Sequence, residues 1–256
     1  MTPEGLFEKL NVFSPIELSY AYLDKGHYDN SGLIINSGKE IGKVLYSLDL
    51  SKQAVMKAKK LNCQAIVTHH PAIYHPIKNL DINGETAAVM FAVANGLSVI
   101  SLHLNLDIAD EGIDESLAKG LGAKETKIIS YIYGNNGYGR EFDIEPIELS
   151  GYAERVKTVF STKKILLYGD KHSIIKKIAS FCGGGSGDAA QYSGDADLIV
   201  TSDMPHHVIK NLVEKGKNIL ILPHYAAEEY GFRKFYERTK DAVGCECYYF
   251  EDKRFK

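Results

Sequence analysis

Along most of the chain, the spacing of hydrophobic and polar residues switches between that of strands and that of helices. Short apolar runs have the length of buried strands, and the segments between them have the spacing of amphipathic helices. Ser51 stands where a helix N-cap is expected, and Gly96 stands where a C-cap is expected. This alternation predicts an α/β protein. The strands predicted in the first half are 42–49, 62–67 and 97–102, and the helices between them are 51–60 and 85–95.

The second half repeats this order of elements. A strand at 196–201, a helix at 208–214 and a strand at 218–222 parallel the elements that precede His103. The turn-forming cluster 134–139, between Ile- and Tyr-rich runs, predicts a hairpin. We therefore expect two similar α/β lobes with mixed sheets, residues 1–125 and 126–256. The alternative is a chance similarity between two α/β segments.

Composition narrows the class of protein. The 256 residues are 45% hydrophobic and 25% charged, as in ordinary globular proteins. A formal net charge of -3 argues against a general nucleic-acid binder. No apolar run approaches the ~20 residues of a membrane span, and the N-terminus does not resemble a secretion signal. These features predict a cytoplasmic protein with no membrane partner.

The cysteines predict no metal site of their own. Cys63, Cys182, Cys245 and Cys247 include no C-x-x-C pair, and the last two lie in a strand-like stretch. We expect buried, reduced thiols. A thiolate metal site is the alternative, but the usual spacing is lacking.

Histidines and carboxylates gather at the predicted strand ends. Two adjacent histidines follow the strand that ends at Val67, and two further histidines each precede a carboxylate by four residues. Such a mixed nitrogen and oxygen set suits Zn, Fe, Mn or Ni better than Ca or Mg. Because open α/β sheets place sites at strand ends, we expect two metal ions in the cleft between the lobes. The candidate ligands are His69, His70, His103, Asp107, His224 and Glu228.

Other positions near these ligands admit two interpretations each. Asp203 occupies the place in the second half that His70 has in the first, and is a candidate to orient a ligand histidine. His206 and His207 either contact a ligand and donate protons, or form a solvated helix start. His75 is either a surface residue beside the site or a substrate contact. The glycine-rich loop 183–187 is either a phosphate cradle or a tight turn for close packing.

The predicted chemistry is metal-assisted hydrolysis. Two ions about 3.5–4 Å apart would bind a water and lower its pKa toward ~7, which presents hydroxide as the nucleophile. The chain shows no Ser/His/Asp or Cys/His arrangement that would supply a protein nucleophile instead. Asp203, His206 and His207 are the candidates for moving protons.

The chain resembles the dinuclear-metal, hexameric family of GTP cyclohydrolase 1 type 2 homologues, also called the Nif-three-like family. The matching motifs run in order through nearly the whole chain. Two positions depart from the family pattern: Ser202 and Pro223 stand where glycine is common, and neither change removes a ligand. The matching segments are 28–33, 68–71, 102–107, 183–187, 196–203 and 224–228.

The resemblance implies a toroidal homohexamer of two-lobed α/β subunits, with two divalent ions per subunit facing the central cavity. It implies that His70 and Asp107 hold one ion, and that His69 and His224 hold the other. Glu228 would bridge the two ions, and His103 would lie at or beside them.

The activity that the resemblance implies is ring-opening hydrolysis of GTP by metal-bound hydroxide. The alternatives are a non-catalytic metal-handling or protein-interaction protein, and a phosphoesterase acting on a nucleotide-like substrate. Fold and site alone do not select the substrate.

Overall fold

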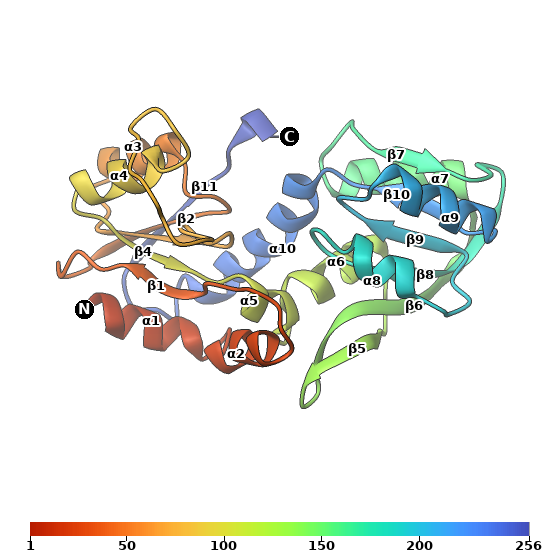
Figure 1. The fold of residues 1–256 in the computed structure, drawn as a ribbon, viewed down its shortest axis with the longest axis horizontal. Coiled ribbons are helices and arrows are strands. Elements are labelled where there is room, and N and C mark those ends of the chain that lie inside the picture. The colour runs from red at the N-terminus through yellow and green to blue at the C-terminus, as the bar shows by residue number, and fades with distance from the viewer. Residues whose placement is uncertain (256) are drawn as a thin grey trace. The chain divides into compact units, whose positions relative to one another are not determined.

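Two mixed β-sheets organise the computed structural model, which describes residues 1–255 (Figure 1). They belong to two compact units, the first comprising Met1–Asp110 and Phe232–Arg254 and the second Glu111–Gly231 and Phe255. The α/β class with mixed sheets, predicted from the sequence, is confirmed.

The first unit contains a five-stranded sheet of order β1-β4-β3-β2-β11. Strands β4, β3, β2 and β11 are parallel to one another, and β1 is antiparallel to β4. The elements of this unit are α1 (Pro3–Asn11), α2 (Ile16–Asp24), β1 (Gly32–Ile35), β2 (Lys43–Ser47), α3 (Lys52–Lys60), β3 (Ala65–Thr68), α4 (Ala87–Ala94), β4 (Ser98–Ser101), α5 (Leu104–Ile108), β11 (Glu246–Phe250) and the 3-10 turn Lys253–Phe255, whose last residue belongs to the second unit.

Both faces of the first sheet are covered, as a mostly parallel sheet requires. Along β2, Leu45 packs on one face in a cluster with residues of α3 and α4, among them Val55 and Ala92. Tyr46 belongs to the other face, where its ring lies 6.2 Å from that of Phe232. Ser51 caps α3 as predicted, because its hydroxyl accepts a hydrogen bond from the Ala54 amide at 3.1 Å.

The second unit contains a six-stranded sheet of order β5-β6-β8-β9-β10-β7. Strands β8, β9 and β10 are parallel, and the remaining pairings are antiparallel. Its elements are α6 (Ile113–Leu121), β5 (Lys127–Tyr133), β6 (Asn136–Glu148), α7 (Leu149–Val159), β7 (Leu166–Tyr168), β8 (Ile174–Ser180), α8 (Ser186–Gln191), β9 (Leu198–Thr201), α9 (His206–Glu214), β10 (Asn218–Ile221) and α10 (His224–Thr239), whose later turns belong to the first unit.

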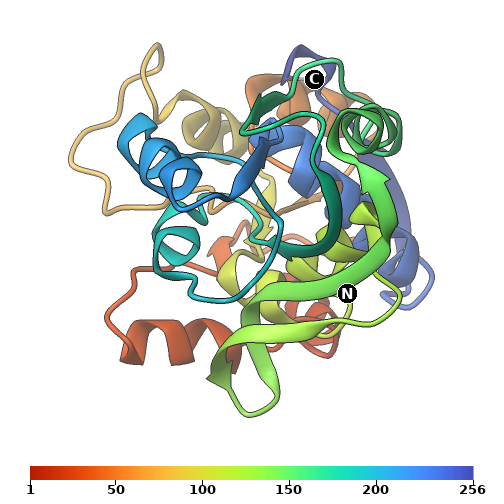
Figure 2. The ribbon, with the colours of Figure 1, turned by 90° about the vertical axis from the view of Figure 1, so that its right-hand side faces the viewer.

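The predicted hairpin is present at the edge of the second sheet. Strands β5 and β6 pair antiparallel, and Figure 2 shows them in green, running side by side to the turn that joins them. A buried ion pair secures this region, since Arg140 of β6 lies 2.9 Å from Asp114 of α6. One face of the sheet packs against α8 and α9 through Ile199, Ile209 and Leu212.

The end of the chain departs from the predicted division at residue 125. Strand β11 pairs in parallel with β2, with Cys247 opposite Val44, and so completes the first sheet rather than the second. A strand that follows the whole second unit in sequence thus belongs to the first, and the boundary between the units falls within α10.

Burial tests the expectation for the cysteines. Cys63 and Cys182 are buried as predicted, whereas Cys245, just before the edge strand β11, and Cys247, within it, are half-buried. Among the described residues, 1–255, no helix combines the length and apolar character needed to cross a bilayer.

Candidate metal centre

The adjacent histidines of the first unit lie directly after the fully buried strand β3. The amides of His69 and His70 both donate to the carbonyl of Leu48, at 3.0 and 3.1 Å. The Thr68 hydroxyl donates to the His70 carbonyl at 2.8 Å. These bonds fix the backbone of the pair, so the two imidazoles have defined directions.

His69 is completely buried, and its contacts define which ring nitrogen carries the proton. Nδ1 lies 2.8 Å from the carbonyl oxygen of Leu102, which can only accept a hydrogen bond, so Nδ1 is the protonated nitrogen. Nε2 lies 3.5 Å from Oδ1 of Asp107. This nitrogen and this carboxylate oxygen therefore face the same point, where a divalent cation would be bound by both.

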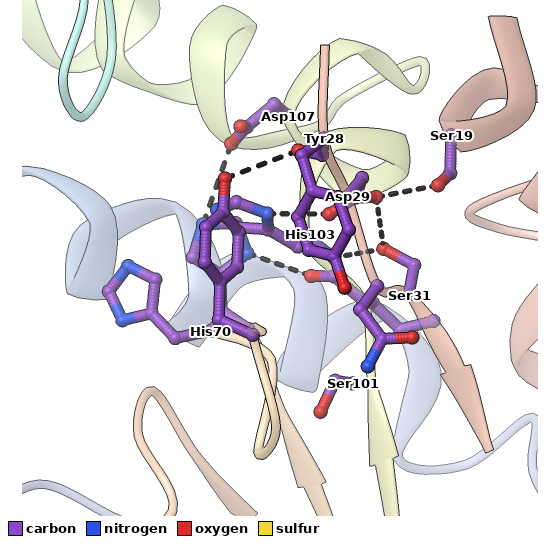
Figure 3. Close-up of polar contacts among 12 residues, drawn as sticks. Ser19, Tyr28, Asp29, Ser31, His70, Ser101, His103 and Asp107 are labelled. Atoms are coloured by element: carbon purple, nitrogen blue, oxygen red, sulfur yellow. Dashed lines mark hydrogen bonds and ion pairs between the residues drawn. The ribbon is translucent and has the colours of Figure 1, made fainter. Parts of the chain in front are cut away.

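His70 and His103 are each held by a carboxylate, and Figure 3 shows Asp29 beside His103. Nδ1 of His70 lies 2.7 Å from Oδ1 of Asp49, and Nδ1 of His103 lies 2.8 Å from Oδ1 of Asp29. A carboxylate on Nδ1 fixes the ring and increases the basicity of Nε2, the arrangement typical of metal-binding histidines.

Asp29 is itself buried and firmly held. The Ser19 and Ser31 hydroxyls donate to its Oδ2 at 2.6 and 2.8 Å. Burial alone would raise the pKa of Asp29, but the hydrogen bond and charge of His103, with the two hydroxyls, hold that pKa below its usual value. Asp29 is therefore an ionised anchor for His103.

The first unit gathers its donor atoms closely enough for one ion to reach several of them. Ligand atoms of His69, His70 and His103 all lie within 4.8 Å of one another. Asp107 follows His103 by one turn of α5, where its amide donates to the His103 carbonyl at 2.9 Å. Three imidazoles and one carboxylate form a donor set that fits Zn, Fe, Mn or Ni.

The second unit offers a smaller set on the first turn of α10. Nδ1 of His224 lies 2.6 Å from Oδ2 of Asp203, and Nε2 lies 3.0 Å from Oε2 of Glu228. The contact between Asp203 and His224 is the one expected from comparing the two halves of the sequence. Glu228 is buried, whereas the side chain of His224 is 32% exposed.

The glycine loop lies against this second set. Gly183 has φ +56°, and a Cβ there would lie 2.5 Å from Oε1 of Glu228. Gly185 has similarly little room, since a Cβ would lie 2.4 Å from that of Phe181. These contacts favour the close-packing interpretation of the loop over the phosphate cradle, and α8, which follows, has only six residues.

A cavity of about 1030 Å³ adjoins the same end of the second unit. Its walls are mainly apolar, with Leu166, Met204 and Ile221 among them, and His224 and Asp203 line one side. Mostly apolar cavities with a few polar groups are the usual form of small-molecule sites.

The remaining predicted residues lie as follows. His206 and His207 are the exposed first residues of α9, and no contact of either with a candidate ligand is described within residues 1–255. His75 packs against the rings of Tyr28 and Tyr74. Asp29 and Asp49 were not predicted as orienting groups; Asp49 is the last residue of the predicted strand 42–49, and Asp29 lies in the matching segment 28–33.

Comparison with known proteins agrees with this architecture. The family model Duf34/NIF3 (NGG1p interacting factor 3) matches residues 2–253. A Clostridium perfringens protein named GTP cyclohydrolase 1 type 2 homolog is 28% identical over 242 residues, covering 91% of each chain. The Saccharomyces cerevisiae protein NGG1-interacting factor 3 is 30% identical over 234 residues, covering 81% of each chain.

Solved structures share the fold. A Bacillus cereus protein related to NIF3 superimposes with a TM-score of 0.87 at 19% identity, covering 98% of this chain and 97% of the other. Reduced HcgD from Methanocaldococcus jannaschii gives a TM-score of 0.82 at 25% identity, covering 98% of both chains. The resemblance inferred from six motifs is thus confirmed, and the chain belongs to the Duf34/NIF3 family.

Proposed function

We propose that this protein is a metal-dependent hydrolase that binds two divalent ions. The proposal rests on one feature that four histidines share, namely an oxygen atom beside Nδ1. In each, Nδ1 lies within hydrogen-bonding distance of an oxygen, from Leu102, Asp49, Asp29 or Asp203, which reserves Nε2 for a metal. The proposed ligands are His69, His70, His103, Asp107, His224 and Glu228.

The number of protein donors supports the binding of two ions. The first unit supplies three imidazoles and a carboxylate, and the second supplies one imidazole and a carboxylate. Six protein donors for two ions leave coordination positions for water and substrate, as catalytic sites require. When bound, the two ions would supply Lewis acidity and an activated water for hydrolysis.

The side chains around the ligands have separate roles in this proposal. Asp29, Asp49 and Asp203 keep a proton on Nδ1 of their histidines and so hold each imidazole in one orientation. Glu228, whose Oε2 lies 3.0 Å from Nε2 of His224, would contribute a carboxylate ligand beside that imidazole. Asp203, together with His206 and His207 three and four residues later, provides exposed groups that exchange protons with solvent.

The names of the relatives make GTP the first substrate to test. Opening of the imidazole ring of guanine is a hydrolysis, which agrees with the chemistry proposed for the donor set. A phosphoesterase would release phosphate and leave the ring intact. The name of the yeast relative, NGG1-interacting factor 3, favours a second candidate, a metal-binding protein that acts through a protein partner without turnover.

The decisive experiment combines metal analysis with GTP incubation followed by mass spectrometry. We expect about two ions per chain and a ring-opened or deformylated guanine product, both lost in Glu228→Ala. Two ions with unchanged GTP would eliminate this substrate, and free phosphate would select the phosphoesterase. A protein that retains no metal after reconstitution would contradict the whole proposal.

The assembly proposed for the chain is the homohexameric ring of its family resemblance. Mass photometry should give particles of six times the 28.4 kDa chain mass. A monomer at micromolar concentration would contradict it.

A further inference from the structure

An aromatic cluster lies next to His103 in the first unit, formed by Tyr28, Tyr74 and His75. The ring of Tyr74 is at its centre, edge-on to the other two: 5.3 Å from Tyr28 at 79° and 4.6 Å from His75 at 70°. The rings of Tyr28 and His75 lie 4.9 Å apart and inclined by 35°. We call these three residues the aromatic wall.

The three side chains of the aromatic wall are exposed to solvent, although aromatic side chains are usually buried. Tyr28 is 43% exposed and Tyr74 is 40% exposed, and His75 is exposed as well. Aromatic rings that serve only the core would be buried, since burial of their apolar area is their main contribution to stability. Exposed rings grouped at a candidate metal centre are instead typical of a binding surface.

Hydrogen bonds hold the wall in a defined place. The Tyr74 hydroxyl donates to the carbonyl of Tyr28 at 3.2 Å. The side-chain amide of Asn30 donates to the carbonyl of Ile73 at 2.5 Å. These bonds join the segment around Tyr28 to the loop that follows His70, so that the rings are pre-organised rather than mobile.

The same segment positions a candidate metal ligand. Asp29 accepts from Nδ1 of His103, and the Ser31 hydroxyl accepts from its amide at 3.0 Å. The ring of Tyr74 lies 5.9 Å from that of His103, at 88°. Figure 3 shows Tyr28 and Asp29 beside His103 and His70. A group resting on the wall is therefore held at a fixed distance from His103.

We propose that the aromatic wall binds the planar heteroaromatic ring of the substrate. This inference rests on the proposed function and narrows its substrate class to compounds that carry such a ring. The wall contains no Lys or Arg, so it does not select phosphate groups, whereas ring faces and edges attract another flat π-system. Stacking of a base on an aromatic side chain contributes enough to decide affinity without selecting one base.

The test measures binding of guanosine, which has the ring but no phosphate, by calorimetry on the metal-loaded protein. Tyr74→Leu should weaken guanosine binding by about 5- to 100-fold, the range expected for one stacked base. Tyr74→Phe keeps the ring, loses only the hydroxyl bond to the Tyr28 carbonyl, and should weaken binding clearly less than Tyr74→Leu does. Tyr131→Leu removes a tyrosine that is 60% exposed on β5 and is the matched control, with no expected effect.

Two further measurements separate ring recognition from damage to the metal site. Metal content should be equal in all variants. If Tyr74→Leu loses metal through its ring contact with His103, then Tyr28→Leu replaces it, because the described ring contacts of Tyr28 are with Tyr74 and His75. Ribose 5-phosphate, which has no heteroaromatic ring, should bind equally to the parent and to either variant.

The outcomes distinguish this inference from the proposed function. The proposal that the wall binds the ring would be wrong if the parent showed no saturable binding of guanosine or adenosine. It would also be wrong if a metal-replete Tyr74→Leu variant bound them as tightly as the parent does. If that variant turned over a nucleotide with unchanged KM, the proposed hydrolase activity would stand, but ring binding by the wall would be excluded. Ring-dependent binding without turnover would support ring binding by the wall and exclude the proposed hydrolase activity.

Discussion

The two units place different chemistry on similar strand ends. In the first, β3 ends at Thr68 and is followed by His69 and His70, both of them candidate ligands. In the second, β9 ends at Thr201 and is followed by Ser202 and Asp203, and Asp203 holds Nδ1 of His224 instead of offering a ligand. Similar strand–helix–strand segments thus supply ligands in one unit and an orienting carboxylate in the other. Repetition of architecture does not imply repetition of function.

The two donor sets also differ in burial. His69 is completely buried, while the side chain of His224 is 32% exposed and that of its partner Asp203 is 67% exposed. A buried imidazole contributes to folding as well as to metal binding, because its removal leaves a cavity and a carbonyl without its donor. His69 should therefore be part of the core, whereas the partly exposed His224 should contribute mainly to metal binding.

The largest expected effect tests this difference directly. His69→Ala should lower the free energy of unfolding of the metal-free protein by about 3 kcal/mol. His224→Ala should change it by less than about 1 kcal/mol, since an exposed ion pair contributes little. Urea unfolding after chelation measures both, and metal analysis should show metal loss in both. Equal destabilisation by His69→Ala and His224→Ala would contradict the expected difference between the two histidines.

The second expected effect concerns the glycine against Glu228. Gly183→Ala should cost about 1–2 kcal/mol for the left-handed backbone alone, and displacement of the Glu228 carboxylate should also weaken metal binding. Gly184→Ala is the matched control, because a Cβ at Gly184 would meet no atom within 4 Å. Thermal unfolding with and without metal measures both variants. A Gly183→Ala protein that is as stable as Gly184→Ala would exclude the packing role.

The third expected effect compares the orienting carboxylates. Asp29→Asn should weaken metal binding about tenfold, because a buried carboxylate transmits its charge to His103 with little screening. Asp203→Asn should weaken it only about two- to threefold, because water and salt screen an exposed charge. Competition with a chromogenic chelator gives both affinities. The reverse order would show that exposure does not determine the contribution of these groups.

The smallest expected effect is a pH dependence in the metal-free protein. Because the pKa of Asp29 is below its usual value in the folded state, its contribution to stability is present above the unfolded pKa of about 3.9 and is lost as pH falls through the folded pKa. Between pH 5 and pH 3, the stability of the parent should therefore fall more steeply than that of Asp29→Asn. Urea midpoints at each pH test this, and parallel slopes would contradict it.

The elements of the repeated segments could be predicted because their signals are local. The predicted strand 62–67 and helix 85–95 correspond to β3 and α4, and Gly96 adopts φ +63° after its helix. The candidate ligands were likewise found because each follows a strand or lies one helical turn from another. The contact of Asp203 was found only by aligning the two halves.

What could not be predicted depends on contacts that are distant in sequence. Asp29 and His103 are 74 residues apart, and no local pattern marks the carboxylate as an anchor. The glycine loop at Gly183 admitted two interpretations until Glu228 was found beside it. Strand β11 has a strand pattern, but nothing in that pattern identifies β2 as its partner.

The pairing of β11 with β2 has a consequence for synthesis on the ribosome. Chains emerge at about 5–20 residues per second, and β2 leaves the ribosome some 200 residues before the strand that covers its open edge. An uncovered strand edge is a site for pairing with other chains. The nascent first unit therefore remains prone to association until β11 has been translated, whereas the segment Glu111–Gly231 of the second unit is contiguous and can complete its own sheet earlier.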